Sequence, residues 1–449
     1  MVRGPRPLSP PKVHHLDPQP GDSFLVHPSG PLHGTICAGG AKNSALKLMA
    51  ACLLAEGRHV LSGVPRIVDV EIMADLLSAI GVRVERLEGP RDGGPGDLVI
   101  DTPAKLVPEA PYELVEKLRA SIVVLGPMLA RSGFARVSLP GGDDFGNRPV
   151  DIHLNALSAM GAFFETVHGY IEGTVTRSAV AHGRLVGSRV VFEYPSHTAT
   201  DNILMAAVLA EGTTIIENAA REPEVVDLAA FLTEMGARIK GAGTSHVEIE
   251  GVEGLVPATH RVVADRVVAA TLLAAVGLAG GDVVVADARA QHMDMLLRKL
   301  STMGLQVAQT PEGLRALADR RLHSVDVATL PYPGVATDYK PFLVTMLSVA
   351  DGVGIVTENL FQGRFRYVDE LRRMGADIRT EGHHAVVRGV ERLSGAPVRA
   401  SDLRAGAALV LAGLVADGET VVSEARHVDR GYEDLAGKLR SLGADVARI

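Results

Sequence analysis

A glycine-rich loop that contains a lysine, Gly39-Gly40-Ala41-Lys42-Asn43, is the first part of the chain whose residue types suggest chemistry. It is not a Walker A loop, because that motif counted from Gly34 places Gly40 where the lysine belongs. The helical pattern that follows, over residues 43–54, would still hold the Lys42 ammonium beside a helix N-terminus, where anions bind favourably. Lys42 is therefore either an anion-binding group on an exposed loop or a solvated lysine after a turn.

The segment from Leu139 to His153 is the most unusual stretch of the chain. It contains three glycines, three aspartates, an arginine and a histidine within 15 residues, a composition typical of a functional loop and not of a core. Asp143, Asp144, Asp151 and His153 have the side chains of metal ligands. Asp151 and His153 fit equally well as the cap and first turn of a following helix.

Arginines recur at predicted strand ends, and guanidinium groups match the oxygens of carboxylates and phosphates. A cleft that gathered them beside Lys42 would suit a polyanionic substrate, although an equivalent structural role in each repeat is the alternative. Asp338 is the acidic residue of this set and a candidate base. The arginines are Arg119, Arg221, Arg364, Arg404 and Arg430.

The elements that must position these side chains form a sixfold repeat. An amphipathic helical stripe ends in a glycine, which supplies the left-handed residue that stops a helix, and a short strand follows. A spacing of about 70 residues is too long for the common solenoid repeats, so each copy is an α/β unit, and six units suggest two clusters of three with a ligand cleft between them. The glycines are Gly81, Gly161, Gly236, Gly304, Gly375 and Gly443.

Composition sets further bounds. The chain of 449 residues is 47% hydrophobic but only 4% aromatic, which predicts cores of Ala, Val, Leu and Ile. A net charge of −8 argues against a nucleic-acid partner. No apolar stretch is long enough to span a membrane, and residues 1–22 are rich in proline without the apolar core of a signal peptide, which indicates a disordered tail. Cys37 and Cys52 form no metal or disulfide pattern, so we expect both to be reduced and buried in a soluble cytoplasmic protein.

Several motifs closely resemble the UDP-N-acetylglucosamine enolpyruvyl transferases (UDP-N-acetylglucosamine 1-carboxyvinyltransferases, the MurA family). The resemblance runs from about residue 23 to the C-terminus in family order. The motifs are Gly40-Ala41-Lys42-Asn43, Leu118-Arg119-Ala120-Ser121, Arg148-Pro149-Val150-Asp151, Glu217 to Glu224, Thr337-Asp338, Phe361 with Arg364, Asp402-Leu403-Arg404-Ala405 and Val428 to Glu433.

This resemblance implies an α/β fold of two inside-out α/β barrel domains, each with three βαβαββ units. Residues 42–262 would form one domain, which carries a mobile loop at 141–147, and residues 23–41 with 263–449 the other. The implied reaction transfers the enolpyruvyl group of phosphoenolpyruvate to the 3-hydroxyl of UDP-N-acetylglucosamine and releases phosphate, by addition and elimination, with no metal or organic cofactor. It is the first committed step of peptidoglycan precursor synthesis. The resemblance leaves the oligomeric state open.

The resemblance also implies roles for individual residues. Asp143 would donate a proton in place of the cysteine that most relatives carry and that fosfomycin alkylates, so the enzyme would be insensitive to that drug. Asp338 would take the 3-hydroxyl proton. The residues that would hold phosphoenolpyruvate are Lys42, Arg148 and Arg430, with Asn43 and Arg404 nearby, and Arg364 would be a further substrate-binding residue. Those that would line the nucleotide-sugar site are Arg119, Arg148, Pro149, Val150, Asp151, Ile152, Ser196 and Leu360.

Two segments depart from the family pattern. Tyr194-Pro195-Ser196-His197-Thr198-Ala199-Thr200 stands where Lys-x-Ser-Val-Gly-Ala-Thr is usual, which removes a charge from the nucleotide site. Asp265-Arg266-Val267-Val268-Ala269-Ala270-Thr271 stands where Asp-Arg-Ile-Glu-x-Gly-Thr is usual. Two alternatives to the peptidoglycan enzyme therefore stay open: a paralogue with another nucleotide or nucleotide-sugar acceptor, as in secondary metabolism, and a catalytically silent binding homologue.

Overall fold

The computed structural model describes residues 22–89, 96–139, 150–175, 183–361 and 363–449. The repeated glycines end helices as predicted, because each has the positive φ that glycine tolerates and other residues avoid. They are Gly81, Gly161, Gly236, Gly304, Gly375 and Gly443, with φ between 87° and 106°.

In the described part of the chain, six four-stranded sheets share one strand order. An edge strand pairs in parallel with a central strand, and two antiparallel strands complete the sheet. Three of the sheets, each in spatial order, are β14 (Thr259–Arg261), β3 (Gly57–Ser62), β5 (Leu98–Thr102) and β4 (Arg83–Arg86); β6 (Glu109–Ala110), β7 (Phe134–Ser138), β9 (Tyr170–Val175) and β8 (Ala162–Val167); and β10 (Arg189–Val191), β11 (Thr213–Glu217), β13 (His246–Glu250) and β12 (Arg238–Lys240). The other three are β2 (Leu32–Cys37), β15 (Gly281–Ala286), β17 (Gly313–Ala318) and β16 (Gln306–Gln309); β18 (Val327–Ala328), β19 (Val353–Thr357), β21 (His384–Arg388) and β20 (Asp377–Glu381); and β23 (Pro397–Arg399), β25 (Thr420–Ser423), β1 (Ser23–Val26) and β26 (Val446–Arg448). A further ladder joins β22 (Leu393–Ser394) and β24 (Ala416–Asp417).

Two main helices per unit complete the βαβαββ pattern. The first precedes the central strand and is mostly buried; these are α1 (Lys42–Ala51), α4 (Leu125–Ser132), α6 (His197–Ala207), α8 (Arg266–Ala279), α10 (Lys340–Val349) and α12 (Leu403–Gly413). The second ends at the repeated glycine; these are α2 (Val68–Ala79), α5 (Asp151–Ala159), α7 (Pro223–Glu234), α9 (Asp294–Met303), α11 (Val368–Arg373) and α14 (Leu435–Ser441). Shorter elements are α3 (Tyr112–Val115), α13 (Arg426–Asp429), η1 (Cys52–Leu54), η2 (Arg119–Val124), η3 (Ala290–His292) and η4 (Thr337–Tyr339). None of the described helices is long and apolar enough to cross a membrane.

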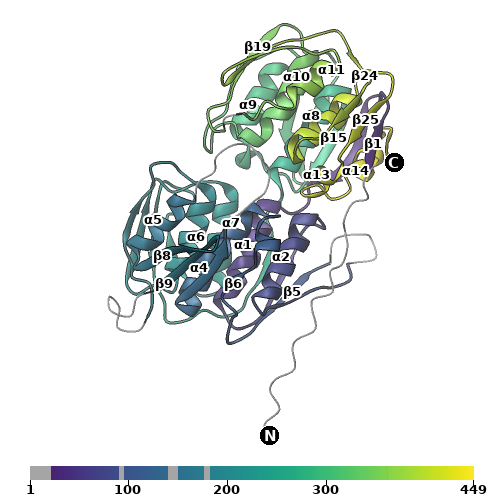
Figure 1. Cartoon of the computed structure of the whole chain (residues 1–449). Helices are drawn as coiled ribbons and strands as arrows, with labels where there is room; N and C mark the ends of the chain where they lie inside the picture. Colours follow the sequence, from purple (N-terminus) through teal and green to yellow (C-terminus); the bar gives the residue numbers. More distant parts are fainter. Residues whose placement is uncertain (1–21, 90–95, 140–149, 176–182, 362) are drawn as a thin grey trace.

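The buried apolar side chains form two cores, which Figure 1 shows as two lobes. The first core draws on residues 41–262, and the second combines residues 24–38 with residues 267–446. In the second core, α8, α10 and α12 contact one another. Alanine and glycine are frequent in α8 and α12 and allow this close approach, while α10 contributes larger side chains that include Phe342. The architecture is the predicted pair of inside-out α/β barrels.

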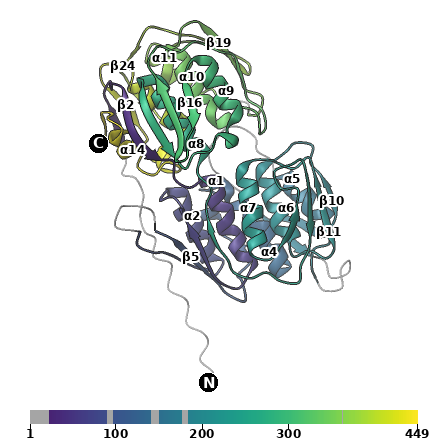
Figure 2. The ribbon, with the colours of Figure 1, turned by 180° about the vertical axis from the view of Figure 1, so that it is seen from behind.

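The first two strands belong to the second lobe although they come first in the sequence. β1 pairs with β25 and β26, and β2 pairs with β15; Figures 1 and 2 show both in the upper lobe. Cys37, at the end of β2, is exposed and Cys52 is buried. The expectation that both cysteines are buried was therefore wrong for Cys37, because its strand lies at the edge of a sheet.

The chain crosses between the lobes twice, and the crossings lie side by side. Gly40 and Ala264 form an antiparallel bridge between them. A Cβ at Gly40 would lie 2.1 Å from the carbonyl oxygen of Gly63, so only glycine fits here. The Asp265 carboxylate caps α8 through one oxygen and accepts the Lys42 N–H, at 3.1 Å, through the other. One side chain therefore fixes the starts of two helices that belong to different cores.

Candidate active site

Lys42 begins α1 at the seam between the two cores, and only 8% of it is exposed. Its ammonium pairs with the carboxylate of Asp69 on α2, which is 1% exposed. Burial lowers the pKa of Lys42; the Asp69 carboxylate opposes that shift, and the positive charge of Arg430 adds to it. The expectation of an exposed loop was wrong, because a buried carboxylate that the sequence analysis missed draws the lysine into the interface.

Asp69 also accepts a hydrogen bond from Arg430, which follows α13 in the second core. Arg430 Nε lies 2.9 Å from Asp69 Oδ1. The two carboxylate oxygens thus hold one cation from each core, and Lys42 and Arg430 lie next to each other on the same partner. Two adjacent cations fixed in this way are suited to binding an anion with several oxygens.

Asp338 lies in η4 and contacts two guanidinium groups of the second core. Arg364 Nη2 lies 2.8 Å from Asp338 Oδ1, and Arg404 Nε lies 3.4 Å from Asp338 Oδ2. Burial would raise the pKa of Asp338, but the charges of Arg364 and Arg404 outweigh it and hold that pKa well below its usual range. The carboxylate is therefore ionised, the state that a proton acceptor requires.

A buried network centred on Glu358 holds this part of the site in place. Thr337 Oγ1 donates to Glu358 at 2.6 Å and accepts from Arg364 Nη1 at 2.9 Å. Lys340 pairs with Glu358 at 2.9 Å, and burial lowers the pKa of Lys340 to about 8. The N–H of Leu360 donates to the same carboxylate at 2.8 Å. Glu358 thus orients the η4 turn and the Leu360 loop together, a role that no sequence motif indicated.

Arg404 presents a charged donor that no described residue uses. It is 2% exposed in the first turn of α12, which Asp402 caps. Its guanidinium carbon lies 5.2 Å from the ring centre of Tyr432. Among the described residues, Arg404 Nη1 has no hydrogen-bond partner although it is buried. An unsatisfied buried donor costs free energy, and a bound anion would remove that cost.

The site as a whole has an excess of positive charge. Four cations face two carboxylates, so the described groups carry a net charge of two positive units. These groups are Lys42, Arg364, Arg404 and Arg430, with Asp69 and Asp338. In a protein whose overall charge is −8, this local reversal of sign favours a polyanionic ligand.

Among the described residues, those predicted for the nucleotide-sugar site lie on the first lobe, apart from Leu360. Asn43 is half-buried in α1, and Arg119 is half-buried at the start of η2. Ser196 caps α6, since its hydroxyl accepts from the N–H of Ala199 at 3.3 Å. Ser196 and Leu360 are both half-buried.

The start of α5 carries three more of the predicted residues. Val150 is the N-cap, Asp151 is the exposed first residue of the helix, and Ile152 is half-buried. Asp151 therefore does not cap the helix, in contrast to one of the two alternatives. His153 accepts from Asn202 at 3.1 Å, and burial followed by the charge of Arg119 lowers the pKa of His153 to about 4.

Some predicted features lie outside the described residues. These are Asp143, Asp144, Arg148 and Pro149, the loop 141–147 and residues 1–21 of the tail.

The altered family segments differ in their surroundings. Tyr194 is 41% exposed, and burial together with Glu222 raises its pKa. Val268 and Ala270 are buried apolar residues of α8. The family's usual glutamate at the position of Val268 would therefore be shielded from water in this chain. The adjacent Arg266 joins the two cores, because its Nε lies 2.9 Å from Glu224 on α7.

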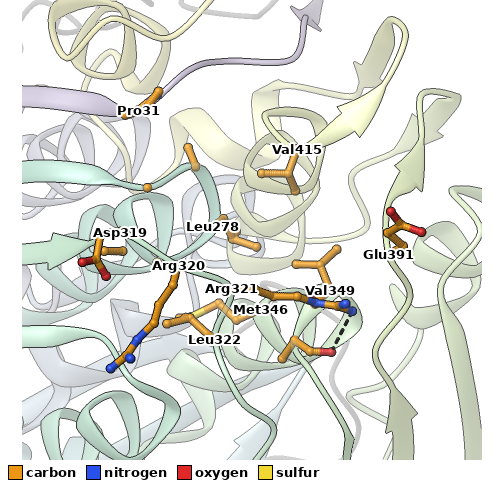
Figure 3. A pocket seen from close by; sticks show the side chains of 15 residues that line it. Pro31, Leu278, Asp319, Arg320, Arg321, Leu322, Met346, Val349, Glu391 and Val415 are labelled. Carbon is orange, nitrogen blue, oxygen red and sulfur yellow. Dashed lines mark hydrogen bonds between the residues drawn. The ribbon is translucent and has the colours of Figure 1, made fainter.

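A cavity of about 420 Å³ lies apart from these groups, at the C-terminal ends of α8 and α10. Figure 3 shows Arg321 beside it, with a hydrogen bond to the main chain; Arg321 Nε donates to the carbonyl oxygen of Val349 at 2.8 Å. The lining residues include no candidate site residue. Arg321 therefore caps the end of α10 and takes no part in the cationic site.

Comparison with known proteins agrees with this geometry. The family described as EPSP synthase (3-phosphoshikimate 1-carboxyvinyltransferase) matches residues 26–439. The crystal structure of the enolpyruvyl transferase NikO from Streptomyces tendae has a TM-score of 0.83 at 24% identity and covers 96% of this chain and 99% of its own. EPSP synthase from Acinetobacter baumannii has a TM-score of 0.73 at 19% identity, over 95% of this chain and 100% of its own. The fold and the site thus define an enolpyruvyl transferase.

More similar sequences narrow this class. The UDP-N-acetylglucosamine 1-carboxyvinyltransferase of Anaeromyxobacter sp. (strain Fw109-5) is 50% identical over 95% of this chain and 99% of its own length. The proteins of the same name from Nocardia farcinica and Myxococcus xanthus are 48% and 46% identical, each over 95% of this chain and 99% of its own. The chain belongs to the UDP-N-acetylglucosamine 1-carboxyvinyltransferase family.

Proposed function

We propose that this transferase moves the enolpyruvyl group of phosphoenolpyruvate to the 3-hydroxyl of UDP-N-acetylglucosamine and releases phosphate. The observation that carries the proposal is the seam itself, where Lys42 and Arg430 share Asp69 while Arg364 and Arg404 flank Asp338. Four fixed cations suit a trianionic substrate, and an ionised carboxylate beside them suits a proton acceptor.

The proposed chemistry has two steps. In the addition, the 3-hydroxyl oxygen bonds to C2 of phosphoenolpyruvate, its proton goes to Asp338, and the methylene carbon C3 takes a proton from Asp143. In the elimination, C3 returns a proton to the Asp143 carboxylate and the bond from C2 to the phosphate oxygen breaks. The phosphate leaves with the proton that Asp338 had taken, and the other product is the enolpyruvyl ether. Lys42, Arg404 and Arg430 would stabilise the charge on the phosphate and carboxylate as C2 gains oxocarbenium character. The proposal needs no metal or organic cofactor.

The remaining site assignments are part of the same proposal. Asn43 would lie near phosphoenolpyruvate, Arg364 would be a further substrate-binding residue, and the nucleotide sugar would contact a larger set of groups. These groups are Arg119, Arg148, Pro149, Val150, Asp151, Ile152, Ser196 and Leu360. We further propose domains of residues 42–262 and of residues 23–41 with 263–449, a closing loop at 141–147 and an N-terminal tail at 1–22.

The cellular role follows from the reaction. We propose a cytoplasmic enzyme that begins peptidoglycan precursor synthesis and thereby serves cell-wall biogenesis, cell shape, the cell cycle and cell division. It would act on its two small-molecule substrates without a nucleic-acid or membrane partner. Asp143 in the place of a cysteine would make it insensitive to fosfomycin, because a carboxylate is a far weaker nucleophile than a thiolate.

Phosphate release from phosphoenolpyruvate, measured with a panel of UDP-sugars and free nucleotides, tests the proposal. Release that depends on UDP-N-acetylglucosamine supports it. Release with a different nucleotide would favour the paralogue of secondary metabolism, which the loss of lysine at Tyr194 makes the second candidate. No release with any acceptor would favour a silent homologue.

A further inference from the structure

His197 lies at the seam of the two cores, where the resembling family carries valine. It is the first residue of α6, next to Ser196, and 20% of its side chain is exposed. Glu224 on α7, and Arg266 and Asp338 of the second core, lie close enough to affect the charge of the ring. An imidazole therefore stands where the family has an apolar side chain, within electrostatic range of the proposed proton acceptor.

One ring nitrogen of His197 already has a partner. Lys47 Nζ lies 3.5 Å from Nε2 with hydrogen-bond geometry. An ammonium group can only donate, so Nε2 is the acceptor and carries no proton. The ring proton of the neutral imidazole then lies on Nδ1, which has no hydrogen bond to any described residue.

The carboxylate of Asp201 pairs with Lys47 but makes no hydrogen bond with Nε2 of His197. Its Oδ2 lies 3.5 Å from Lys47 Nζ and 3.4 Å from His197 Nε2, and the side chain is fully buried. Within the described part of the chain, neither carboxylate oxygen has a partner with hydrogen-bond geometry. Burial and then the positive charge of Lys47 lower the pKa of His197 well below its ordinary value, so the ring stays neutral at neutral pH.

We propose that His197 is a further acceptor-binding residue, which donates its Nδ1–H to an oxygen of the nucleotide sugar, and that Lys47 positions it by fixing the tautomer. The inference rests on the proposed function. A phosphoryl oxygen is the favoured partner, because the positive end of α6 lies at the same residue. The neutral donor would serve in place of the charge that is absent at Tyr194.

Three substitutions test the role of the side chain. His197→Ala removes both nitrogens, His197→Asn keeps an N–H near the Nδ1 position, and His197→Gln keeps a polar group near Nε2. We expect His197→Ala and His197→Gln to raise the KM for the acceptor at least about tenfold, with the KM for phosphoenolpyruvate unchanged, and His197→Asn to stay within about threefold of wild type. His246→Ala, at an exposed position at the start of β13, is the matched control.

A role limited to packing against Lys47 predicts the opposite order, with the Gln variant active and the Asn variant impaired, and that result would overturn the proposal. Binding of UDP alone shows which oxygen accepts the hydrogen bond. A variant with lower affinity for UDP identifies a phosphoryl oxygen, and a variant with lower affinity only for the full nucleotide sugar identifies a sugar oxygen. Nitrogen-15 spectra of the wild-type histidines give a test that needs no variant. A proton on Nε2 of His197 would refute the fixed tautomer.

The comparison uses whichever acceptor supports phosphate release in the panel above. A wild-type protein that is inactive with UDP-N-acetylglucosamine but active with another nucleotide would count against the proposed function alone. The order of the Asn and Gln variants with that nucleotide would still decide the role of His197.

Discussion

Asp69→Asn is the substitution that most directly tests the cationic seam. Asparagine keeps the size of the side chain but removes the charge that holds Lys42 and Arg430, and Asp69 is only 1% exposed. Removing one partner of a buried, hydrogen-bonded charge pair costs about 2–5 kcal/mol. The Asp69 carboxylate also keeps the Lys42 ammonium charged against burial, so the variant would favour a neutral lysine. We therefore expect weaker binding of phosphoenolpyruvate and a kcat/KM at least about 30-fold lower.

The assay is steady-state phosphate release at varied phosphoenolpyruvate, together with thermal unfolding. Asp101→Asn is the control, because it makes the same change in the surface pair with Arg58, whose side chain is 67% exposed while that of Asp101 is 31% exposed. It should leave the kinetics unchanged. An Asp69→Asn enzyme that keeps kcat/KM within about threefold of wild type while remaining folded would refute the argument that this carboxylate organises the two cations.

Other expectations cover the remaining parts of the site. Lys42→Ala should reduce the rate of phosphate release below about a tenth of wild type, a loss of at least about 1.4 kcal/mol, while far-ultraviolet circular dichroism shows a folded protein; a higher rate would contradict its assignment. Gly40→Ala should lower the melting temperature and the soluble yield, because its Cβ would overlap the Gly63 carbonyl at 2.1 Å, and an unchanged melting temperature would count against that close approach. His153 is neutral in the folded protein, so the unfolded chain binds its proton first as the pH falls below about 6.5, and stability is lost until the folded pKa of about 4 is reached. Between about pH 6.5 and pH 4.5, chemical denaturation should show that the free energy of unfolding of wild type falls by about 2 kcal/mol more than that of His153→Gln. Equal decreases would show that His153 is not the cause of this pH dependence. Asp143→Cys should stay active and gain a mass increase of one fosfomycin molecule, and an active variant that remains unmodified would show that residue 143 does not reach the reacting carbon.

The sequence by itself determined the sixfold repeat of α/β units, and its resemblance to a known family extended that repeat to a fold of two barrels. Glycines at a regular spacing mark helix ends because only glycine adopts positive φ without cost, and such a local preference needs no knowledge of the tertiary structure. Residue types in the loops and at strand ends indicated Lys42, Asp338, Arg364, Arg404 and Arg430 as candidates, motif resemblance added their roles, and all five lie at the seam.

Only the tertiary structure decided which charges are paired. Asp69 is one turn before Met73 on the apolar stripe of α2, and an acidic residue on a buried face was the one signal that could have revealed it. Its partner Arg430 is 361 residues away in the sequence. Likewise, Glu358 gains its role from contacts with Thr337 and Lys340 that have no fixed spacing. Ion pairing depends on the distance between charges and on their exclusion from water, and both quantities exist only once distant segments have packed together.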